Sequence, residues 1–235
     1  MSIEDGDIAR FAGVSTATLT MVLLKHGLRN VWLRGARAPA AGGGRVAGRA
    51  FTLRFIPARE DLATPAALAS GRSTRVAIEA MPPGCIVVAD AMGRTDAGIV
   101  GDILCARMKL RGVAALVTDG AVRDAPGIAG VGLPVWCQGS AAPPSLSALT
   151  FANWQEPVGC GGAAVFPDDI IVADQDGAVV VPRALAAAVL AAAAEQERLE
   201  RWIMGEVVRG VPLPGLYPPD AAALERFRAA RPQDA

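Results

Sequence analysis

The chain has 235 residues, of which 52% are hydrophobic, and its formal net charge is zero. A length of this order suits one large domain or two small ones, with a sizeable buried core. The balanced charge, without a long run of one sign, argues against a protein that binds nucleic acid by counterion release. It also argues against a basic helix that lies on a membrane surface.

The composition carries no targeting or membrane signal. The longest apolar run, residues 184–194, is too short to cross a bilayer. The first residues, MSIEDGDIARF, are acidic and lack the basic and apolar regions of a signal peptide. We therefore expect a cytoplasmic protein whose four widely spaced cysteines are reduced and buried as small hydrophobic side chains.

The N-terminal part of the chain predicts an amphipathic helix and then a strand. Apolar side chains recur at helical spacing over residues 15–27, and a glycine ends the pattern. His26 falls on the apolar face of this helix, so a buried or interface histidine is a better interpretation than a catalytic one. A flexible loop is expected at residues 38–45. Alternation over residues 49–57 then predicts a half-buried strand with Thr52 on its polar face.

The remaining part predicts strands separated by helices. Buried strands are expected at residues 85–90 and 113–118, with a helix over 101–110 between them. The segment DDIIVADQDGAVVVP, at residues 168–182, joins two apolar runs through Asp-Gln-Asp-Gly and predicts a hairpin. A long helix over residues 182–204 follows, with proline in its first turn. An antiparallel hairpin beside a strand–helix–strand unit implies a single α/β domain with a mixed sheet.

The scarcity of histidine and lysine narrows the chemistry. His26 is the only histidine, and Lys25 and Lys109 are the only lysines. Lys109 lies well beyond Asp102, about 10 Å along a helix, so a Schiff-base mechanism at that aspartate is poorly supported. The sequence also lacks a phosphate-binding P-loop and a dinucleotide-binding fingerprint. What remains is the chemistry of acids, arginine and backbone amides.

Two turns that carry charge bound the segment GDILCARMKLRGVAALVTDGAVRD, residues 101–124. At the first turn, the amides that begin the helix lack intrahelical partners and carry partial positive charge. Gly98 and Gly101 let a ligand approach this backbone closely, so the turn predicts a binding site for a carboxylate or phosphate. The alternative is that Asp102 only stabilises the helix end, and spacing by itself favours this alternative.

The second turn carries Arg123 and Asp124 just after the strand at residues 113–118, at an edge where α/β sheets gather ligands. The guanidinium suits a carboxylate or enolate oxygen. The carboxylate suits Mg²⁺, which often takes one or two protein carboxylates and keeps several waters. The alternative is a surface ion pair of little energetic consequence. Because the intervening helix returns the chain to the same sheet edge, both turns are expected to lie there, which makes the alternatives about equal.

The segments GDILCARMKLRGVAALVTDGAVRD and ADQDGAVVVP resemble the RraA-like family, and the similarity is densest over residues 83–182. This family includes divalent-metal-dependent 4-hydroxy-4-methyl-2-oxoglutarate aldolases and regulators of ribonuclease E activity. The resemblance implies a single swivelling β/β/α domain over residues 1–235, with a mixed central sheet and flanking helices. Its core would span about residues 14–204, with a C-terminal extension at 205–235. It also implies homotrimers or homohexamers with active sites near subunit interfaces.

The resemblance also assigns roles to the two turns. The amides at the start of the helix would bind the carboxylate of a pyruvate unit. Arg123 would contact the substrate, Asp124 would hold the divalent metal, Mg²⁺ or Mn²⁺, and Asp102 would orient a water that moves protons. Family regulators without aldolase activity lack parts of this metal-binding set, so the complete set here resembles that of an enzyme. The substrate-binding amides are those of Gly101, Asp102, Ile103 and Leu104.

The chain departs from the family pattern in two places. Many family aldolases carry an acidic residue a few positions after Arg-Asp, where this chain reads APGIAG. The hairpin follows Pro-Asp-Asp instead of the more usual Pro-Gly-Asp. The resemblance further implies that a neighbouring subunit contributes an acidic residue to each site. The sequence leaves four candidates open, which are Glu195, Glu197, Glu200 and Glu206.

Together with these residues, the resemblance implies a metal-dependent lyase that cleaves 4-hydroxy-2-oxo acids to pyruvate by a retro-aldol reaction. Oxaloacetate decarboxylase activity should accompany it, because loss of CO₂ leaves the same pyruvate enolate. The expected partners are a small 2-oxo acid and further copies of the chain, with no nucleic acid and no membrane. One alternative is a non-catalytic regulator that binds a ribonuclease or another protein and needs no metal. Another is a metal-dependent lyase or isomerase that acts on a different sugar-derived or aromatic-derived oxo acid.

Overall fold

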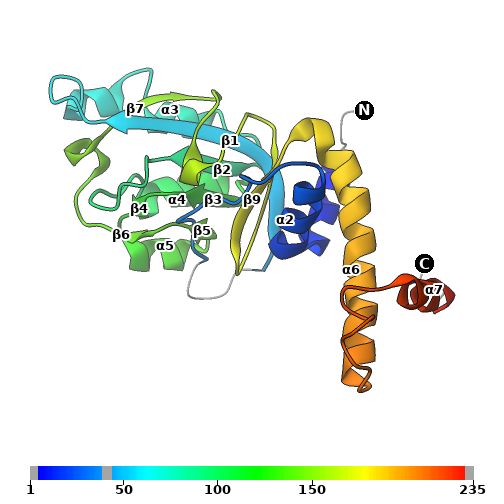
Figure 1. Ribbon diagram of the computed structural model, residues 1–235. Helices are drawn as coiled ribbons and strands as arrows, with labels where there is room; N and C mark the ends of the chain where they lie inside the picture. The colour runs from blue at the N-terminus through cyan, green and yellow to red at the C-terminus, as the bar shows by residue number, and fades with distance from the viewer. Residues whose placement is uncertain (1–4, 39–43, 231–235) are drawn as a thin grey trace.

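The computed structural model of the protein describes residues 5–38 and 44–230 (Figure 1). The α-helices are α1 (Asp5–Arg10), α2 (Thr16–Lys25), α3 (Thr74–Glu79), α4 (Asp102–Leu110), α5 (Ala125–Val131), α6 (Ala186–Val208) and α7 (Ala221–Ala229). The strands are β1 (Val46–Pro57), β2 (Ile86–Asp90), β3 (Ala115–Thr118), β4 (Ala121–Val122), β5 (Val135–Trp136), β6 (Gly139–Ser140), β7 (Leu149–Trp154), β8 (Ile170–Asp174) and β9 (Gly177–Val181). Most of the loop expected at residues 38–45 lies outside the described residues.

The main sheet is mixed and has the strand order β5-β3-β2-β1-β8-β9, with β7 also paired to β1. Strands β1, β2, β3 and β5 pair in parallel, whereas β7, β8 and β9 pair antiparallel. The hairpin predicted at residues 168–182 is present as β8 and β9. The prediction of an α/β fold with a mixed central sheet and flanking helices is confirmed.

Strand β1 runs through the centre of this sheet and curves across the molecule in Figure 1. Its first part pairs with β8, its middle with β2 and its last part with β7. The prediction of a half-buried strand is wrong at Thr52, which is fully buried. The loop after β7 covers it, and the Thr52 hydroxyl donates to the Glu156 carbonyl at 2.7 Å. Alternation within the strand could not show this, because the cover comes from a segment 104 positions away.

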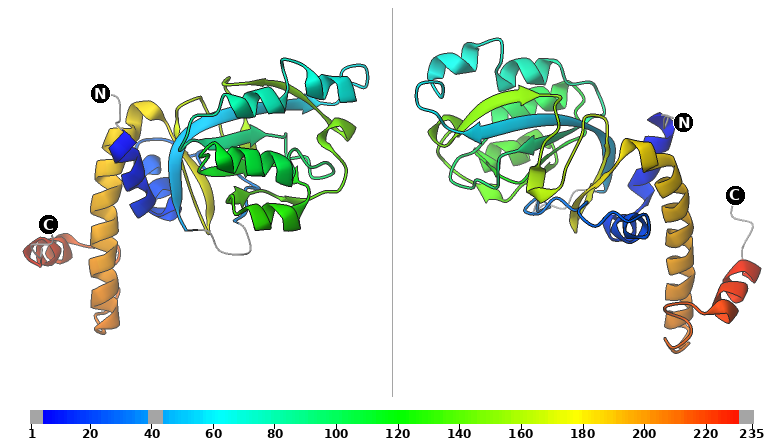
Figure 2. Two further views of the ribbon diagram at one scale, coloured as in Figure 1. Left: turned by 180° about the vertical axis from the view of Figure 1, so that it is seen from behind. Right: turned by 45° about the horizontal axis from the view of Figure 1, so that its top comes forward.

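Helices cover both faces of the sheet, so alternate strand residues enter two different cores (Figure 2). Ile86 and Val88 of β2 join the core that contains residues of α1, α2 and α6. Val87 and Ala89 join the core that contains residues of α3, α4 and α5. Burial on both faces explains why β2 is a continuous apolar run without alternation.

Helix α2 ends before the histidine that its pattern includes. Lys25 is the last helical residue, and His26 is the C-cap. His26 is exposed in this chain, so the prediction of a histidine buried in the core is wrong, and the interface alternative stays a prediction. The reason is local, because Gly27 adopts φ 83° and turns the backbone away at this point.

The sequence patterns do not predict β7 or α5, although both are present. Pro126, Gly127 and Gly130 fall within α5, and glycine and proline are poor helix formers. Strand β7 depends on its pairing with β1 at the edge of the sheet. Tertiary contacts therefore decide both elements.

Helix α6 extends beyond the body of the molecule in Figure 1, and α7 lies beside its distal part. The Trp202 and Phe227 rings are 5.7 Å apart, and the Arg226 guanidinium stands 5.9 Å from the centre of the Trp202 ring. Among the described residues, no single helix has the length and apolar character to span a membrane. One bent pair, Gly6–Gly13 with Thr16–Lys25, passes that test on length and composition when the two helices are taken together.

Candidate active site

The two charged turns pair with each other through their backbones. Gly98 forms a parallel bridge with Ala121. The Ile99 amide donates to the Ala121 carbonyl at 3.0 Å, and the Arg123 amide donates to the Val100 carbonyl at 2.9 Å. The loop after β2 therefore runs alongside the loop after β3, at the carboxyl edge of the sheet. Because these loops lead into α4 and α5, their pairing places the start of α4 beside the start of α5.

Each of the two site carboxylates packs over a glycine of the other segment. A methyl carbon placed on Gly101 would lie 2.4 Å from Asp124 Oδ2. A methyl carbon placed on Gly127 would lie 2.4 Å from Asp102 Oδ2. The structure therefore brings Asp102 and Asp124 to one place, and it uses glycine on both sides to do so. Gly127 was not among the residues expected here, because the sequence patterns do not predict α5 and so give no reason to single out a glycine within it.

Arg123 and Asp124 form an ion pair at the surface of this site. Arg123 Nε lies 3.1 Å from Asp124 Oδ2, with the two side chains 38% and 42% exposed. Asp124 adopts φ 57° and ψ 40°, a left-handed conformation that is uncommon for residues other than glycine. Backbone conformations of this kind cluster at functional sites. Half-exposure leaves both charged groups accessible to a ligand.

Asp102 is the first residue of α4, and Gly101 is its N-cap. The Asp102 Oδ1 atom accepts the Ile103 amide at 2.7 Å. One of the four amides expected to bind substrate thus donates to a protein carboxylate in this structure, and a bound anion would have to replace or share that bond. The Ile103 side chain is 80% exposed, which leaves the start of α4 open on its outer side.

Asp119, which follows β3, is a structural residue at the edge of this site. Its carboxylate accepts the amides of Ala91, Gly93 and Gly161 at 2.8, 3.1 and 3.0 Å. Burial raises the pKa of Asp119 above its ordinary value, and the hydrogen bonds from these amides partly offset that effect. The three amides come from two loops, so Asp119 ties the loops together.

The donor atoms present fit a hard divalent cation. Among the described residues, no group of three or more His, Cys, Asp or Glu side chains is arranged to hold a metal ion. Asp124, with Asp102 beside it, offers carboxylate oxygens that suit Mg²⁺ or Mn²⁺, which keep several waters. The closed nitrogen and sulfur set of a structural zinc site does not match these residues.

The four glutamates that could contribute to the site of a neighbouring subunit all lie on α6, and they have different partners within their own chain. Glu197 accepts the Ser15 amide at 2.8 Å and so stabilises the start of α2 in its own chain. Glu195 and Glu206 pair with arginines three residues along the helix. Glu200 accepts from a glutamine one turn away at 2.8 Å. Which of them reaches a neighbouring subunit stays a prediction.

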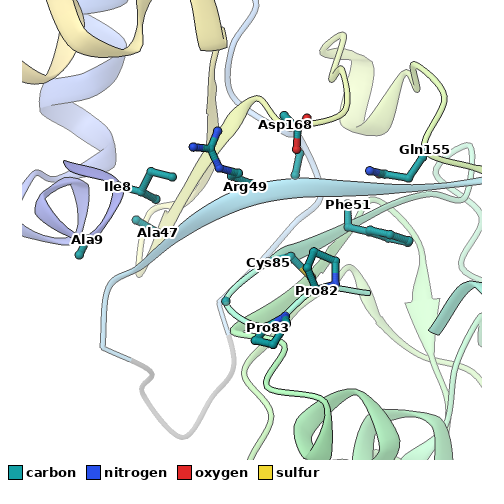
Figure 3. A pocket seen from close by; sticks show the side chains of 12 residues that line it. Ile8, Ala9, Ala47, Arg49, Phe51, Pro82, Pro83, Cys85, Gln155 and Asp168 are labelled. Carbon is teal, nitrogen blue, oxygen red and sulfur yellow. The ribbon is translucent and has the colours of Figure 1, made fainter. Parts of the chain in front are cut away.

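A groove of about 370 Å³ lies between the first half of β1 and the segment that precedes β2 (Figure 3). Its lining includes Phe51, Pro82 and Pro83, together with the polar side chains of Arg49 and Gln155. The two prolines precede β2, whereas the candidate site follows the carboxyl ends of β2 and β3. The groove therefore contributes no residue to the candidate site.

Comparison with known proteins matches most of the chain to one family. A family profile described as "RraA-like: Aldolase/RraA" matches residues 14–180. A protein of Halalkalibacterium halodurans named "Putative 4-hydroxy-4-methyl-2-oxoglutarate aldolase" is 35% identical over 130 residues, or 54% of this chain and 61% of that protein. The similarity to this protein and to two other curated relatives covers 61%, 22% and 60% of their lengths, less than two thirds in each case.

Solved structures are similar over more of the chain. Streptomyces coelicolor RraAS2, described as an unusual member of the RNase ES inhibitor RraA protein family, is 34% identical with a TM-score of 0.77. That similarity covers 86% of this chain and 97% of RraAS2. An uncharacterised protein from Pseudomonas syringae pv. tomato is 26% identical with a TM-score of 0.80, covering 92% of this chain and 95% of that one. The mixed sheet and its flanking helices are thus shared with both.

Proposed function

We propose that this chain, which belongs to the RraA-like family, is a divalent-metal-dependent lyase that cleaves 4-hydroxy-2-oxo acids to pyruvate. The observation that carries the proposal is the meeting of Asp102, Arg123 and Asp124 at the start of α4. The name of the H. halodurans relative supports the reaction class and a substrate of the 4-hydroxy-4-methyl-2-oxoglutarate type. We further propose that the protein is a homotrimer or homohexamer whose subunits complete each site.

The residues of the chain would share the work of binding and proton transfer. The partly positive start of α4, including the Ile103 amide, would bind the substrate carboxylate. A water held by Asp102 would take the proton of the 4-hydroxyl group. The carbon–carbon bond would then break, leaving a carbonyl on one product and the electron pair on the pyruvate enolate. Arg123 and the amides would stabilise the charge on that enolate until the water returns a proton to its carbon.

Asp124 is the residue that would hold the cation. A divalent cation bound there would supply Lewis-acid polarisation of the substrate's 2-oxo group. Arg123 would orient the same end of the substrate, because its guanidinium lies beside the Asp124 carboxylate. Decarboxylation of oxaloacetate would use the same residues, since it leaves the same enolate.

The test is pyruvate release by the purified protein with Mg²⁺ or Mn²⁺. We expect pyruvate from both 4-hydroxy-4-methyl-2-oxoglutarate and oxaloacetate, detected by coupling to lactate dehydrogenase. EDTA should abolish the activity and added Mg²⁺ should restore it. If neither substrate yields pyruvate with either cation, the proposed function is wrong.

A second function, regulation of a ribonuclease by binding, is favoured by the similarity to RraAS2. The two functions differ in their need for metal. Isothermal titration with Mn²⁺ and a binding assay with a purified RNase E-type ribonuclease separate them. Tight ribonuclease binding by a chain that has no affinity for Mn²⁺ would favour the regulator.

A further inference from the structure

We propose that Gly127 is a positioning residue, whose missing side chain lets α5 approach α4 and so sets the spacing between the carboxylates of Asp102 and Asp124. In this proposal Gly127 does not contact the substrate or the metal and acts only through the positions of Asp102 and Asp124. Its effect on turnover rests on the proposed function, whereas its effect on the packing of the two helices does not. Nothing in the sequence pattern assigns it this role.

The contact at Gly127 involves more than a mobile carboxylate. A methyl carbon there would lie 2.4 Å from Asp102 Oδ2, 2.9 Å from its Cγ and 2.7 Å from its Cβ. Rotation about χ1 can move the carboxylate, although it would also break the bond to the Ile103 amide. Rotation cannot move Cβ, because the α4 backbone sets its place. Relief of the contact therefore requires the two helices to separate.

The backbone at this position does not itself require glycine. Gly127 lies within α5, and its φ is not in the left-handed region. Alanine is more favourable than glycine inside a helix, so the local energy of α5 argues for alanine here. Gly130 stands in the same helix and would meet nothing within 4 Å. Both glycines therefore lower the intrinsic stability of α5 relative to alanine. Only at Gly127 would an added methyl carbon meet a close neighbour.

Separation of the helices would displace the proposed metal ligand. Asp124 is the N-cap of α5, and its Oδ2 atom packs over Gly101 at the start of α4. A shift of α5 would move Asp124 and the adjoining Arg123 relative to Asp102 and the amides of α4. Misplacement of reacting groups by about 1 Å can reduce turnover about 100-fold.

A double-mutant cycle in urea tests the packing without any assay of activity. Gly130→Ala should shift the unfolding equilibrium about fivefold toward the folded state. Gly127→Ala in the natural chain should shift it toward the unfolded state. In an Asp102→Gly background, where Cβ and the carboxylate are absent, Gly127→Ala should instead stabilise as Gly130→Ala does. If Gly127→Ala stabilises the natural chain to the same extent as Gly130→Ala, the inference is overturned.

Steady-state kinetics test the positioning role. Gly127→Ala should lower kcat about tenfold or more while KM changes less than about threefold, because the α4 amides that would bind the substrate carboxylate keep their places on α4, whereas Asp124 and Arg123 move with α5. Gly130→Ala should leave both constants within about twofold. A destabilised Gly127→Ala variant with unchanged kcat would overturn the positioning role. Absence of pyruvate from the natural chain would overturn the proposed function, and the urea cycle would still decide the packing separately.

Discussion

Two pairs of aspartates in this protein, Asp119 with Asp174 and Asp102 with Asp124, differ in how many hydrogen-bond donors their carboxylates accept from. Asp174 accepts hydrogen bonds from two amides, a hydroxyl and a guanidinium, and Asp119 accepts three amides. In the part of the chain that the structure describes, Asp102 accepts one amide and Asp124 pairs with one guanidinium. Asp119 and Asp174 are 4% and 8% exposed, whereas the Asp124 side chain is 42% exposed.

All these residues lie at strand ends or helix starts, so position along the chain does not separate the two pairs. The difference lies in the number of donors that the fold directs at each carboxylate. A saturated, buried carboxylate stabilises the loops that supply its donors. A carboxylate with free oxygen lone pairs at the surface is available to water, a cation or a substrate. The predictions that follow test this distinction, from the largest expected effect to the smallest.

The largest effect is expected when Asp124 loses its charge and keeps its shape. Asp124 adopts φ 57°, which asparagine tolerates, so Asp124→Asn should keep the turn. We expect pyruvate release to fall about 10³-fold, while the free energy of unfolding changes by less than about 0.5 kcal/mol. Kinetics and urea unfolding measure the two quantities. If Asp124→Asn retains the turnover of the natural chain, Asp124 has no role in the reaction.

Arg123→Lys should show whether the guanidinium acts through its geometry. Lysine keeps the charge and loses the planar fork, so we expect kcat/KM to fall about 100-fold. Stability should change little, because both members of the ion pair are well exposed. Arg107→Lys is a matched control, since Arg107 makes a bidentate pair with Glu79, the last residue of α3. An equal fall in both variants would contradict a specific role for Arg123.

Asp119→Asn should have the opposite profile to Asp124→Asn. Both Asp119 oxygens accept amides, and an asparagine NH₂ group would leave either the buried Ala91 amide or the partly buried amides of Gly93 and Gly161 without an acceptor. We expect a loss of about 2 kcal/mol in the free energy of unfolding. Urea unfolding measures it. A neutral result would show that the loops do not depend on Asp119, and the distinction between the two pairs would fail.

The smallest effect is the pH dependence of stability that Asp174 contributes. Burial raises the pKa of Asp174, but hydrogen bonds from the Thr16 amide and hydroxyl, with others, bring it below its ordinary value. A lowered pKa in the folded state means that the stabilisation is present above about pH 4 and is lost as the pH falls through the folded value. Asp174→Asn should therefore flatten the loss of stability between neutral pH and acid. Urea unfolding of the two proteins at several pH values measures this. If the free energy of unfolding falls equally steeply with pH in both proteins, the contribution of Asp174 is contradicted.

The sequence predicted those parts of the fold that depend on neighbouring residues. The hairpin of β8 and β9 follows from two apolar runs joined by Asp-Gln-Asp-Gly. The strand–helix–strand unit of β2, α4 and β3 follows from apolar runs and glycine breaks. From that unit alone, the two charged turns could be assigned to one edge of the sheet, because parallel strands place their carboxyl ends together.

Only the tertiary structure decided how the two turns meet. The packing of Asp124 over Gly101 and of Asp102 over Gly127 joins segments more than twenty positions apart. The burial of Thr52 likewise depends on a loop far along the chain. Periodicity and turn chemistry record the preferences of a residue and its close neighbours. Contacts between distant segments depend on how the completed sheet brings the helices together, and no local pattern encodes that distance.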